Sequence, residues 1–435
     1  MLEIQIPANN IEEREYVIGV LFSEFLGLPY DLITSDSELH YSISFGEHKI
    51  LVKDAFFSQY RVASSYLSAD SLPGKIVYAR NEFTPEDNIP IIFGTETMQV
   101  EEKKIFCGVD IFASSFFMLT RWEEYVNRAR DKHQRFSGEE SIAFKNNFLH
   151  RPVVNEYAEM LWNMLVRLDY KGERKERKFE LCLTHDVDAV SLVSFKSLAG
   201  DVLKRKDFKL ALKNSRYLFL HDPFDTYDFL MTASEKLGVK SHFYFMSTNS
   251  KREYDSGYYL YRRMFHSRIK EIKKRGHIIG FHPGYYTFDD PEKWLSEKER
   301  LEEAVQQEIV EGRQHFLRMD VTKTLPIWEK NRMEIDSTLG YTDKEGFRCG
   351  TGDLFPVFNF LERKQSSLEE RPLIIMDGTL LEYREYSKEQ AAETIRYYIS
   401  VGKKYKTIIT LLFHNSSFFG EWEGYETIYK DLLNV

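Results

Sequence analysis

The feature that most limits how this chain can fold is a pair of carboxylates at the end of a short apolar run. Residues 181–183 have the composition of a buried strand, and Asp186 and Asp188 follow within a Thr-His-Asp-Val-Asp sequence. Side chains two residues apart lie on the same face of a strand. Two like charges on one face cost free energy unless a cation or a shared proton compensates for them. The pair predicts either a metal-dependent site at a strand terminus or two aspartates that cap the next segment.

Two further apolar runs end at an imidazole. Residues 278–281 follow a glycine and stop at His282, and residues 407–413 stop at His414. In α/β folds with parallel strands, functional residues gather where strands end at their carboxyl termini. A single histidine at such a position is more often structural than a ligand. Three strand ends that carry Asp/Asp, His and His favour one common site.

In this order the three segments resemble the polysaccharide deacetylase superfamily, which is also known as the NodB-homology or carbohydrate esterase 4 superfamily. The resemblance covers residues 178–435, and a Gly-Arg-Gln-His-Phe sequence and an Asp-Ser-Thr strand lie between the second and last motifs. What it implies for single residues is a catalytic base at Asp186, metal ligands at Asp188 and His282, an arginine that contacts the base at Arg313, and a general acid at His414.

One position departs from the superfamily pattern. The resemblance implies a second metal-binding histidine four residues after His282, but Tyr286 stands there, and a neutral phenol is a poor ligand. A zinc-type site would then lack one of its usual three protein ligands. His315 and Asp377 are the candidates to complete it, and substrate contact or a structural hydrogen bond are alternatives for His315. Without such a ligand, the divalent metal, expected to be zinc, would bind weakly.

The segments between the motifs alternate between apolar runs and amphipathic stretches, which predicts a parallel α/β sheet. The resemblance makes residues 178–435 a distorted (β/α)7-type barrel. The predicted elements include strands at 242–246 and 278–281 and helices at 192–220, 226–237, 261–275 and 294–311.

A charged run at residues 169–178 predicts a linker, so residues 1–172 are expected to form a smaller accessory α/β or α+β domain. This half resembles the N-terminal domain of unknown function that precedes certain bacterial NodB-like domains. A helix is expected over residues 110–127, with Asp110 near its N-cap. Charged residues early in its second half, Arg121, Glu123 and Glu124, could reach the catalytic domain, but a solvated charged face is the favoured interpretation.

Composition fits a large enzyme and excludes several classes of partner. With 435 residues, 43% of them hydrophobic, the chain can bury two cores. A net charge of −9 leaves no basic surface for nucleic acid, and no apolar window is long enough to span a membrane. Three scattered cysteines and the absence of a signal-like N-terminus favour the cytoplasm. Tyrosine-rich runs at residues 256–261 and 283–286 could contact a glycan.

The function expected from these parts is metal-dependent hydrolysis of an N-acetyl group on a sugar or glycan intermediate. Two alternatives stay open. One is a scaffold that has lost strong metal affinity and binds a glycan or a partner, which Tyr286 supports. The other is hydrolysis of a non-sugar C–N amide. No serine-hydrolase elbow, zinc-protease helix, phosphate-binding loop or dinucleotide fingerprint is present.

Overall fold

The computed structural model describes residues 1–191, 222–248, 253–255, 258, 260–261 and 263–431. The chain divides into two compact units that are interleaved along the sequence. Unit 1 contains residues 1–180, 319–374 and 398–409, and unit 2 contains residues 181–318, 375–397 and 410–435. A domain boundary between residues 172 and 178 stays a prediction. The helix expected over residues 192–220 and part of the tyrosine run at 256–261 lie outside the described residues.

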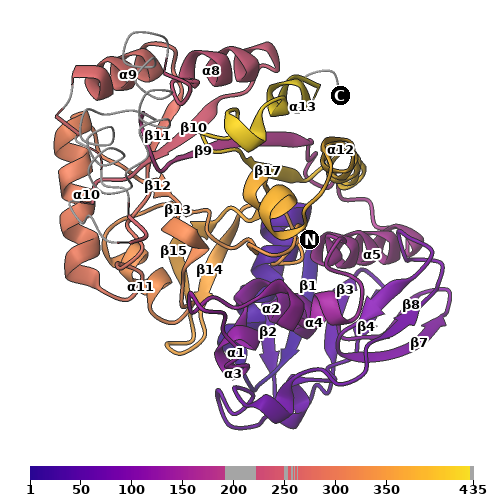
Figure 1. Ribbon diagram of the computed structural model, residues 1–435. Coiled ribbons are helices and arrows are strands. Elements are labelled where there is room, and N and C mark those ends of the chain that lie inside the picture. Colours follow the sequence, from indigo (N-terminus) through magenta and orange to yellow (C-terminus); the bar gives the residue numbers. More distant parts are fainter. Residues whose placement is uncertain (192–221, 249–252, 256–257, 259, 262, 432–435) are drawn as a thin grey trace. The chain divides into compact units, whose positions relative to one another are not determined.

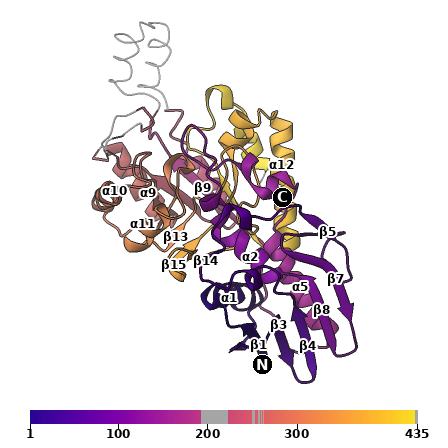
Figure 2. The same cartoon turned by 90° about the horizontal axis from the view of Figure 1, so that it is seen from below.

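Unit 1 contains a six-stranded sheet in the order β2-β1-β3-β4-β8-β7, a two-stranded sheet β5-β6, and the adjacent strands β14-β15-β13. Helix α2 packs against both α1 and α5 beside the larger sheet (Figure 2). The strands are β1 (Leu2–Pro7), β2 (Tyr30–Ser35), β3 (Tyr41–Phe45), β4 (His48–Val52), β5 (Val77–Ala79), β6 (Ile89–Ile91), β7 (Gly94–Val100), β8 (Lys104–Val109), β13 (Ile335–Asp336), β14 (Phe355–Asn359) and β15 (Lys364–Glu370). The helices are α1 (Ile11–Ile18), η1 (Gly19–Leu26), η2 (Phe57–Gln59), η3 (Ala69–Ser71), α2 (Ile111–Thr120), α3 (Trp122–Val126), η4 (Gly138–Glu140), α4 (Ile142–Lys145), α5 (Val153–Arg167) and α11 (Thr324–Lys330).

The helix expected over residues 110–127 is interrupted after its tenth residue. The Asp110 carboxylate accepts a hydrogen bond from the backbone N–H of Ala113 at 3.0 Å, which confirms the N-cap. The helix ends at Arg121, whose φ of 54° is left-handed. The expectation of a solvated charged face was wrong, because Arg121 is buried and forms ion pairs with Glu123 and Glu124 at 2.8 and 2.9 Å. These pairs bury charge that the sequence pattern alone assigns to solvent.

A buried pair of carboxyl groups joins two strands of unit 1. Asp336 on β13 and Glu370 on β15 lie opposite each other in parallel register, and both are fully buried. Burial and the neighbouring Asp336 raise the pKa of Glu370 well above its ordinary value. Arg348 and the backbone N–H of Leu339 oppose this rise without cancelling it. The pair is therefore most stable when it holds a proton.

Replacing Glu370 by Gln is expected to flatten the dependence of thermal stability on pH. An acid whose pKa is raised in the folded state loses stability as pH rises from its unfolded pKa toward its folded pKa. Wild type should therefore lose a few degrees of melting temperature between about pH 5 and pH 8 that the Gln variant keeps. Melting curves across this range check the result. Glu362→Gln, at a half-exposed side chain, is the matched control. Parallel pH profiles for all three proteins would contradict the buried-pair argument.

The strands of unit 2 lie in the order β12-β11-β10-β9-β17-β16, and they form a curled α/β sheet of the barrel-like kind (Figure 1). Strand β10 is parallel to β9 and to β11, and β11 is parallel to β12. How many strands close a barrel stays a prediction. The strands are β9 (Glu180–Val187), β10 (Ser241–Phe245), β11 (Ile278–Phe281), β12 (Glu311–Gly312), β16 (Leu373–Met376) and β17 (Ile408–Leu412), of which β9, β16 and β17 contain residues assigned to both units.

Helices cover this sheet, and β10 and β11 are almost wholly buried, as parallel strands with covered faces should be. Helix α8 packs against β10, and α9 packs against β11 (Figure 1). The helix expected over 294–311 begins earlier, at Pro291, and ends at Val305, because Gln306 is left-handed and the following chain forms β12. The helices are α8 (Tyr227–Lys236), α9 (Arg263–Lys274), α10 (Pro291–Val305), η6 (His315–Leu317), η7 (Thr379–Tyr383), α12 (Lys388–Tyr405), η8 (Gly420–Trp422) and α13 (Tyr425–Asp431), of which α12 contains residues assigned to both units. Among the described helices, none has the length and apolar character that a membrane span needs.

Candidate active site

Polar side chains gather where the strands of unit 2 end. The four neighbouring strands β9, β10, β11 and β12 are parallel, so their carboxyl ends lie at one edge of the sheet. Asp186 lies near the end of β9 and Asp188 just beyond it, whereas His282 directly follows β11 and Arg313 directly follows β12. His414 lies two residues past the end of β17. Local strand signals thus explain how residues distant in sequence reach one edge.

Two of these side chains, Asp188 and His282, form with His315 of η6 a group that could hold a metal ion. The ligand atoms of Asp188, His282 and His315 all lie within 4.8 Å of one another. Both histidines are buried, and the Asp188 side chain is 36% exposed. Two imidazoles and one carboxylate are a typical three-residue set for a catalytic zinc site. The identity of an ion is not fixed by this donor set alone, because imidazole also suits other divalent transition metals.

Each histidine is oriented so that the same ring nitrogen faces Asp188. Nδ1 of His282 lies 2.7 Å from the Arg313 carbonyl oxygen, which can only accept, so this nitrogen carries the proton. Nδ1 of His315 lies 3.3 Å from Oδ1 of Asp255. The opposite Nε2 atoms lie 3.2 Å and 3.6 Å from Oδ1 of Asp188. Partners of this kind on the far ring nitrogen are what fix metal-binding histidines.

One buried nitrogen atom indicates that these residues suit a metal ion. Nε2 of His282 is buried and makes no hydrogen bond of good geometry to any residue that the structure describes. With its proton on Nδ1, this nitrogen presents a lone pair toward the Asp188 carboxylate, which also can only accept. Two acceptors that face each other are unfavourable in a buried site. A divalent cation between them would satisfy both.

The pKa values of Asp188 and His315 reflect how close these two side chains lie to each other. Burial alone would raise the pKa of Asp188, but His315 holds it well below its ordinary value. Burial would lower the pKa of His315, whereas Asp188 and Asp255 raise it to about 9.

His315 reaches the cluster through a strained turn. Its backbone N–H donates to the Pro283 carbonyl at 3.2 Å, which ties the turn η6 to the loop that carries His282. The next two residues, Phe316 and Leu317, have φ values of 61° and 51°, which are unusual for side chains of this size. Such conformations cost about 1–3 kcal/mol each and concentrate at functional sites.

Tyr286, at the position where the superfamily pattern implies a histidine, makes two contacts through its ring. Its ring lies beside that of Tyr285, with centroids 4.9 Å apart, and Lys293 Nζ lies 5.0 Å from its centre. Both contacts are made by the ring of Tyr286 and not by its hydroxyl group. His315 is the second imidazole of the group that could hold a metal ion.

Asp186 is held by a buried arginine. Nη1 of Arg313 donates to Oδ1 of Asp186 at 2.8 Å and to the Thr184 hydroxyl at 3.0 Å. Asp186 is 2% exposed and Arg313 is fully buried. One carboxylate oxygen is thus occupied by the guanidinium, which fixes the plane of the carboxyl group beside the metal-binding group.

His414 is held by Asp377. Nδ1 of His414 lies 2.9 Å from Oδ1 of Asp377, and the backbone N–H of His414 donates to Oδ2 at 2.7 Å. The Ser417 hydroxyl donates to the same oxygen. Burial lowers the pKa of His414, but Asp377 raises it to about 10. Nε2 of His414 lies 3.8 Å from Oδ2 of Asp188, so this nitrogen faces the metal-binding group.

Two placements were not foreseen from the sequence. Asp377, expected as a possible ligand or substrate contact, lies against His414 and is outside the metal-binding group of the described residues. Asp255, which orients His315 and also accepts from the backbone N–H of Tyr285 at 2.8 Å, was missed. The amino-acid sequence around Asp255 has no apolar periodicity that could have singled it out.

Comparisons with known proteins cover parts of the chain. A family described as "Family of unknown function (DUF7033)" matches residues 2–170. Among solved structures, the chain is similar to "Crystal structure of putative polysaccharide deacetylase from Mycobacterium smegmatis" at 16% identity and a TM-score of 0.40. This similarity covers 60% of the present chain and 85% of the other. No curated protein matches the chain.

Proposed function

We propose that this protein is a metal-dependent hydrolase that removes an N-acetyl group from a sugar or glycan intermediate. The observation that carries the proposal is the grouping of Asp188, His282 and His315, with the Nε2 atoms of both histidines turned toward one carboxylate oxygen. The motif resemblance of residues 178–435 supports the same reaction class. Carbohydrate is the expected substrate class, and zinc is the expected ion.

Each remaining site residue has a role in amide hydrolysis. A divalent ion bound by Asp188, His282 and His315 would polarise the acetamide carbonyl and lower the pKa of a bound water. Asp186 would take the proton of the attacking water, and Arg313 keeps the carboxylate in position for this transfer. His414, oriented by Asp377 through Nδ1, would give a proton from Nε2 to the departing amine.

The alternative of a scaffold without metal affinity rested on Tyr286. His315 weakens that alternative, because it supplies the imidazole that Tyr286 does not. A binding protein also has no need for a buried base, an arginine that orients it and an acid with its own carboxylate partner. Hydrolysis of a non-sugar amide uses the same groups, and only substrate screening separates it from the proposal.

Metal analysis followed by an acetate-release assay tests the proposal. Protein purified without chelator should contain a divalent metal, and apo protein should bind zinc or cobalt at micromolar concentration. Acetate should then be released from N-acetylated mono- or oligosaccharides. If wild type binds neither metal at that concentration, the proposed mechanism fails and the binding scaffold replaces it. Release from simple amides alone would favour the non-sugar hydrolase.

The His414→Ala variant is expected to lose more activity on amides than on activated esters. An amine leaves only when it is protonated, whereas a good alcohol leaving group needs little protonation. The loss on an acetamide should be about 10²–10⁴-fold, and the loss on an aryl acetate should be smaller. Paired turnover measurements on both substrates check this difference. Equal losses would give His414 a role in orienting the substrate rather than in acid catalysis.

A further inference from the structure

A pocket lies in unit 1, at residues 53–94. Its volume is about 460 Å³, within the range of roughly 300–1,000 Å³ that is usual for small-molecule sites. The walls are the turn after β4 (residues 53–60), the loop at residues 70–74 and the segment that joins β6 to the start of β7 (residues 92–94). We call it the 53–94 pocket.

The pocket lies at the carboxyl ends of strands that run in one direction. Strands β4 and β8 are parallel, and β1, β2 and β4 point the same way through the antiparallel strand β3. The turn at residues 53–60 directly follows β4. In α/β sheets the crevice beyond the carboxyl ends of the strands is where ligands bind. The position is therefore the one that this topology favours for a site.

Buried side chains from the neighbouring strand ends hold the turn in place. Asn9 and Asn10, which follow β1, donate to the carbonyl oxygens of Phe57 and Tyr60 at 2.7 Å each. Asp110, which follows β8, accepts from the backbone N–H groups of Ala55 and Phe56 at 2.8 and 3.0 Å. A pocket wall that is fixed in this way loses little entropy when a ligand binds.

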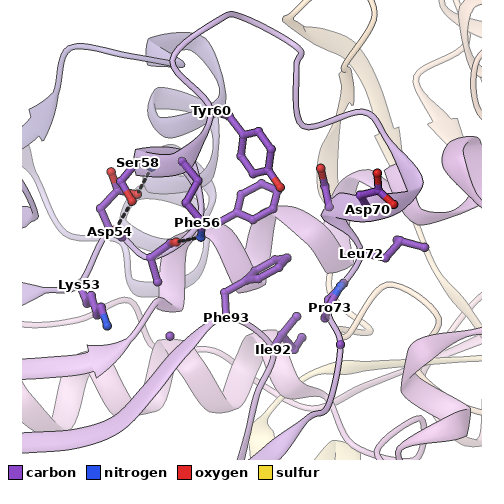
Figure 3. A pocket seen from close by; sticks show the side chains of 15 residues that line it. Lys53, Asp54, Phe56, Ser58, Tyr60, Asp70, Leu72, Pro73, Ile92 and Phe93 are labelled. Atoms are coloured by element: carbon purple, nitrogen blue, oxygen red, sulfur yellow. Dashed lines mark hydrogen bonds between the residues drawn. The ribbon is translucent and has the colours of Figure 1, made fainter.

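The chemistry of the pocket combines aromatic rings with open polar groups. Phe56 contacts both Phe93 and Tyr60, with ring centroids 4.3 and 4.9 Å apart. In Figure 3 these rings lie together, with Lys53 on one side and Asp70 on the other. The ammonium group of Lys53, the hydroxyl of Tyr60 and the carboxylate of Asp70 have no hydrogen-bond or ion-pair partner in the described part of the chain.

The balance of charge selects among ligand classes. A phosphate or other anion is disfavoured, because the pocket lining contains one lysine and two aspartates. Asp54 is unavailable to a cation, because it is buried and paired with Arg14 at 2.7 Å. One free carboxylate, one free ammonium and one hydroxyl beside an aromatic surface suit a neutral ligand with one apolar face and many hydroxyl groups.

We propose that the 53–94 pocket binds a sugar ring. The apolar C–H face of the ring lies on Tyr60 and Phe93, and its hydroxyl groups hydrogen-bond to Lys53 and Asp70. This site belongs to unit 1 and does not depend on the hydrolase activity proposed for unit 2. The proposal assigns a recognition role to residues within the segment that matches only a family of unknown function.

Saturation-transfer NMR on the full chain tests the proposal. The probes are D-glucose, D-galactose, D-mannose and N-acetyl-D-glucosamine at millimolar concentration. At least one should receive saturation, most strongly at the protons of one ring face. Asp70→Asn should weaken its binding about tenfold, because a hydrogen bond to a charged carboxylate becomes a weaker one to a neutral amide. Asp70 is exposed, so this variant should fold normally. Asp36→Asn, at another exposed aspartate of unit 1, should bind like wild type.

Two substitutions at one position separate stacking from hydrogen bonding. Tyr60→Ala should weaken binding up to about tenfold, and Tyr60→Phe should keep most of it, because the ring remains. Binding that survives both Tyr60→Ala and Asp70→Asn would place the sugar elsewhere, for example at the unit 2 site, and would overturn the proposal. Failure of all four sugars to bind wild type would also overturn it. Acetate release has no bearing on either outcome.

Discussion

Replacing Asp186 by Asn should remove most turnover, by about 10²–10⁴-fold, while leaving the metal content unchanged. The amide cannot take a proton from water, but its oxygen can still accept the hydrogen bond from Arg313 that Asp186 accepts at 2.8 Å. Asp186 is outside the group formed by Asp188, His282 and His315, so metal binding should persist. The measurements are acetate release and metal content on the same preparation.

The control for this variant must address stability, because Arg313 is buried and loses a charged partner. Breaking a buried ion pair can cost about 3–5 kcal/mol, so the melting temperature should be measured beside the activity. Asp228→Asn, at a side chain that is 83% exposed, is the matched substitution on the surface of unit 2. Turnover that stays near wild type in a folded Asp186→Asn protein would remove Asp186 from the mechanism.

The second large effect is expected at His315. His315→Ala should weaken zinc affinity by more than about 100-fold, since it removes one of three ligands and not only a supporting group. Asp255→Asn should weaken affinity less, by about 10–100-fold, because Asp255 does not belong to the group itself and contacts it through Nδ1 of His315. Tyr286→His should change zinc affinity little if His315 already supplies the third ligand. Competition titrations with a metal chelator give all three values.

An exposed histidine provides the control for loss of an imidazole. His266 lies on the surface of α9, and His266→Ala should bind zinc like wild type. The opposite pattern, with tighter binding in Tyr286→His and unchanged binding in His315→Ala, would mean that the site uses the position of the superfamily pattern after all. Asp255→Asn would then have no effect on affinity either.

Sequence patterns predicted those parts of the site that local structure determines. Asp186, His282 and His414 each lie at the end of a strand. An apolar run that ends at a polar residue can be recognised from the sequence alone. The position of His315 beside His282 depends on the turn of Phe316 and Leu317. The left-handed backbone conformation of these two residues is not indicated by their residue types. The partners Asp255 and Asp377 act through contacts across long stretches of chain, which periodicity cannot report.

The same limit applies to the fold. Strand and helix positions in unit 2 follow from apolar periodicity, as β10, β11 and α9 show. The interleaving of the two units does not, because the return of residues 319–374 to unit 1 is a property of tertiary packing. The burial of Arg121 with Glu123 and Glu124 could not be predicted either. In a sequence, charged residues that pair with one another in the interior cannot be distinguished from charged residues on the surface.

The origin of the two histidines in different loops has a consequence for stability. A metal that joined neighbouring residues of one loop would constrain little, whereas His282 and His315 belong to segments that follow separate strands. Binding would therefore act as a cross-link that closes a long stretch of chain, including α10, and would stabilise the folded state by mass action. Hydrogen exchange in the segments around both histidines should slow together when zinc is added. Removal of the metal should release both segments as one cooperative unit.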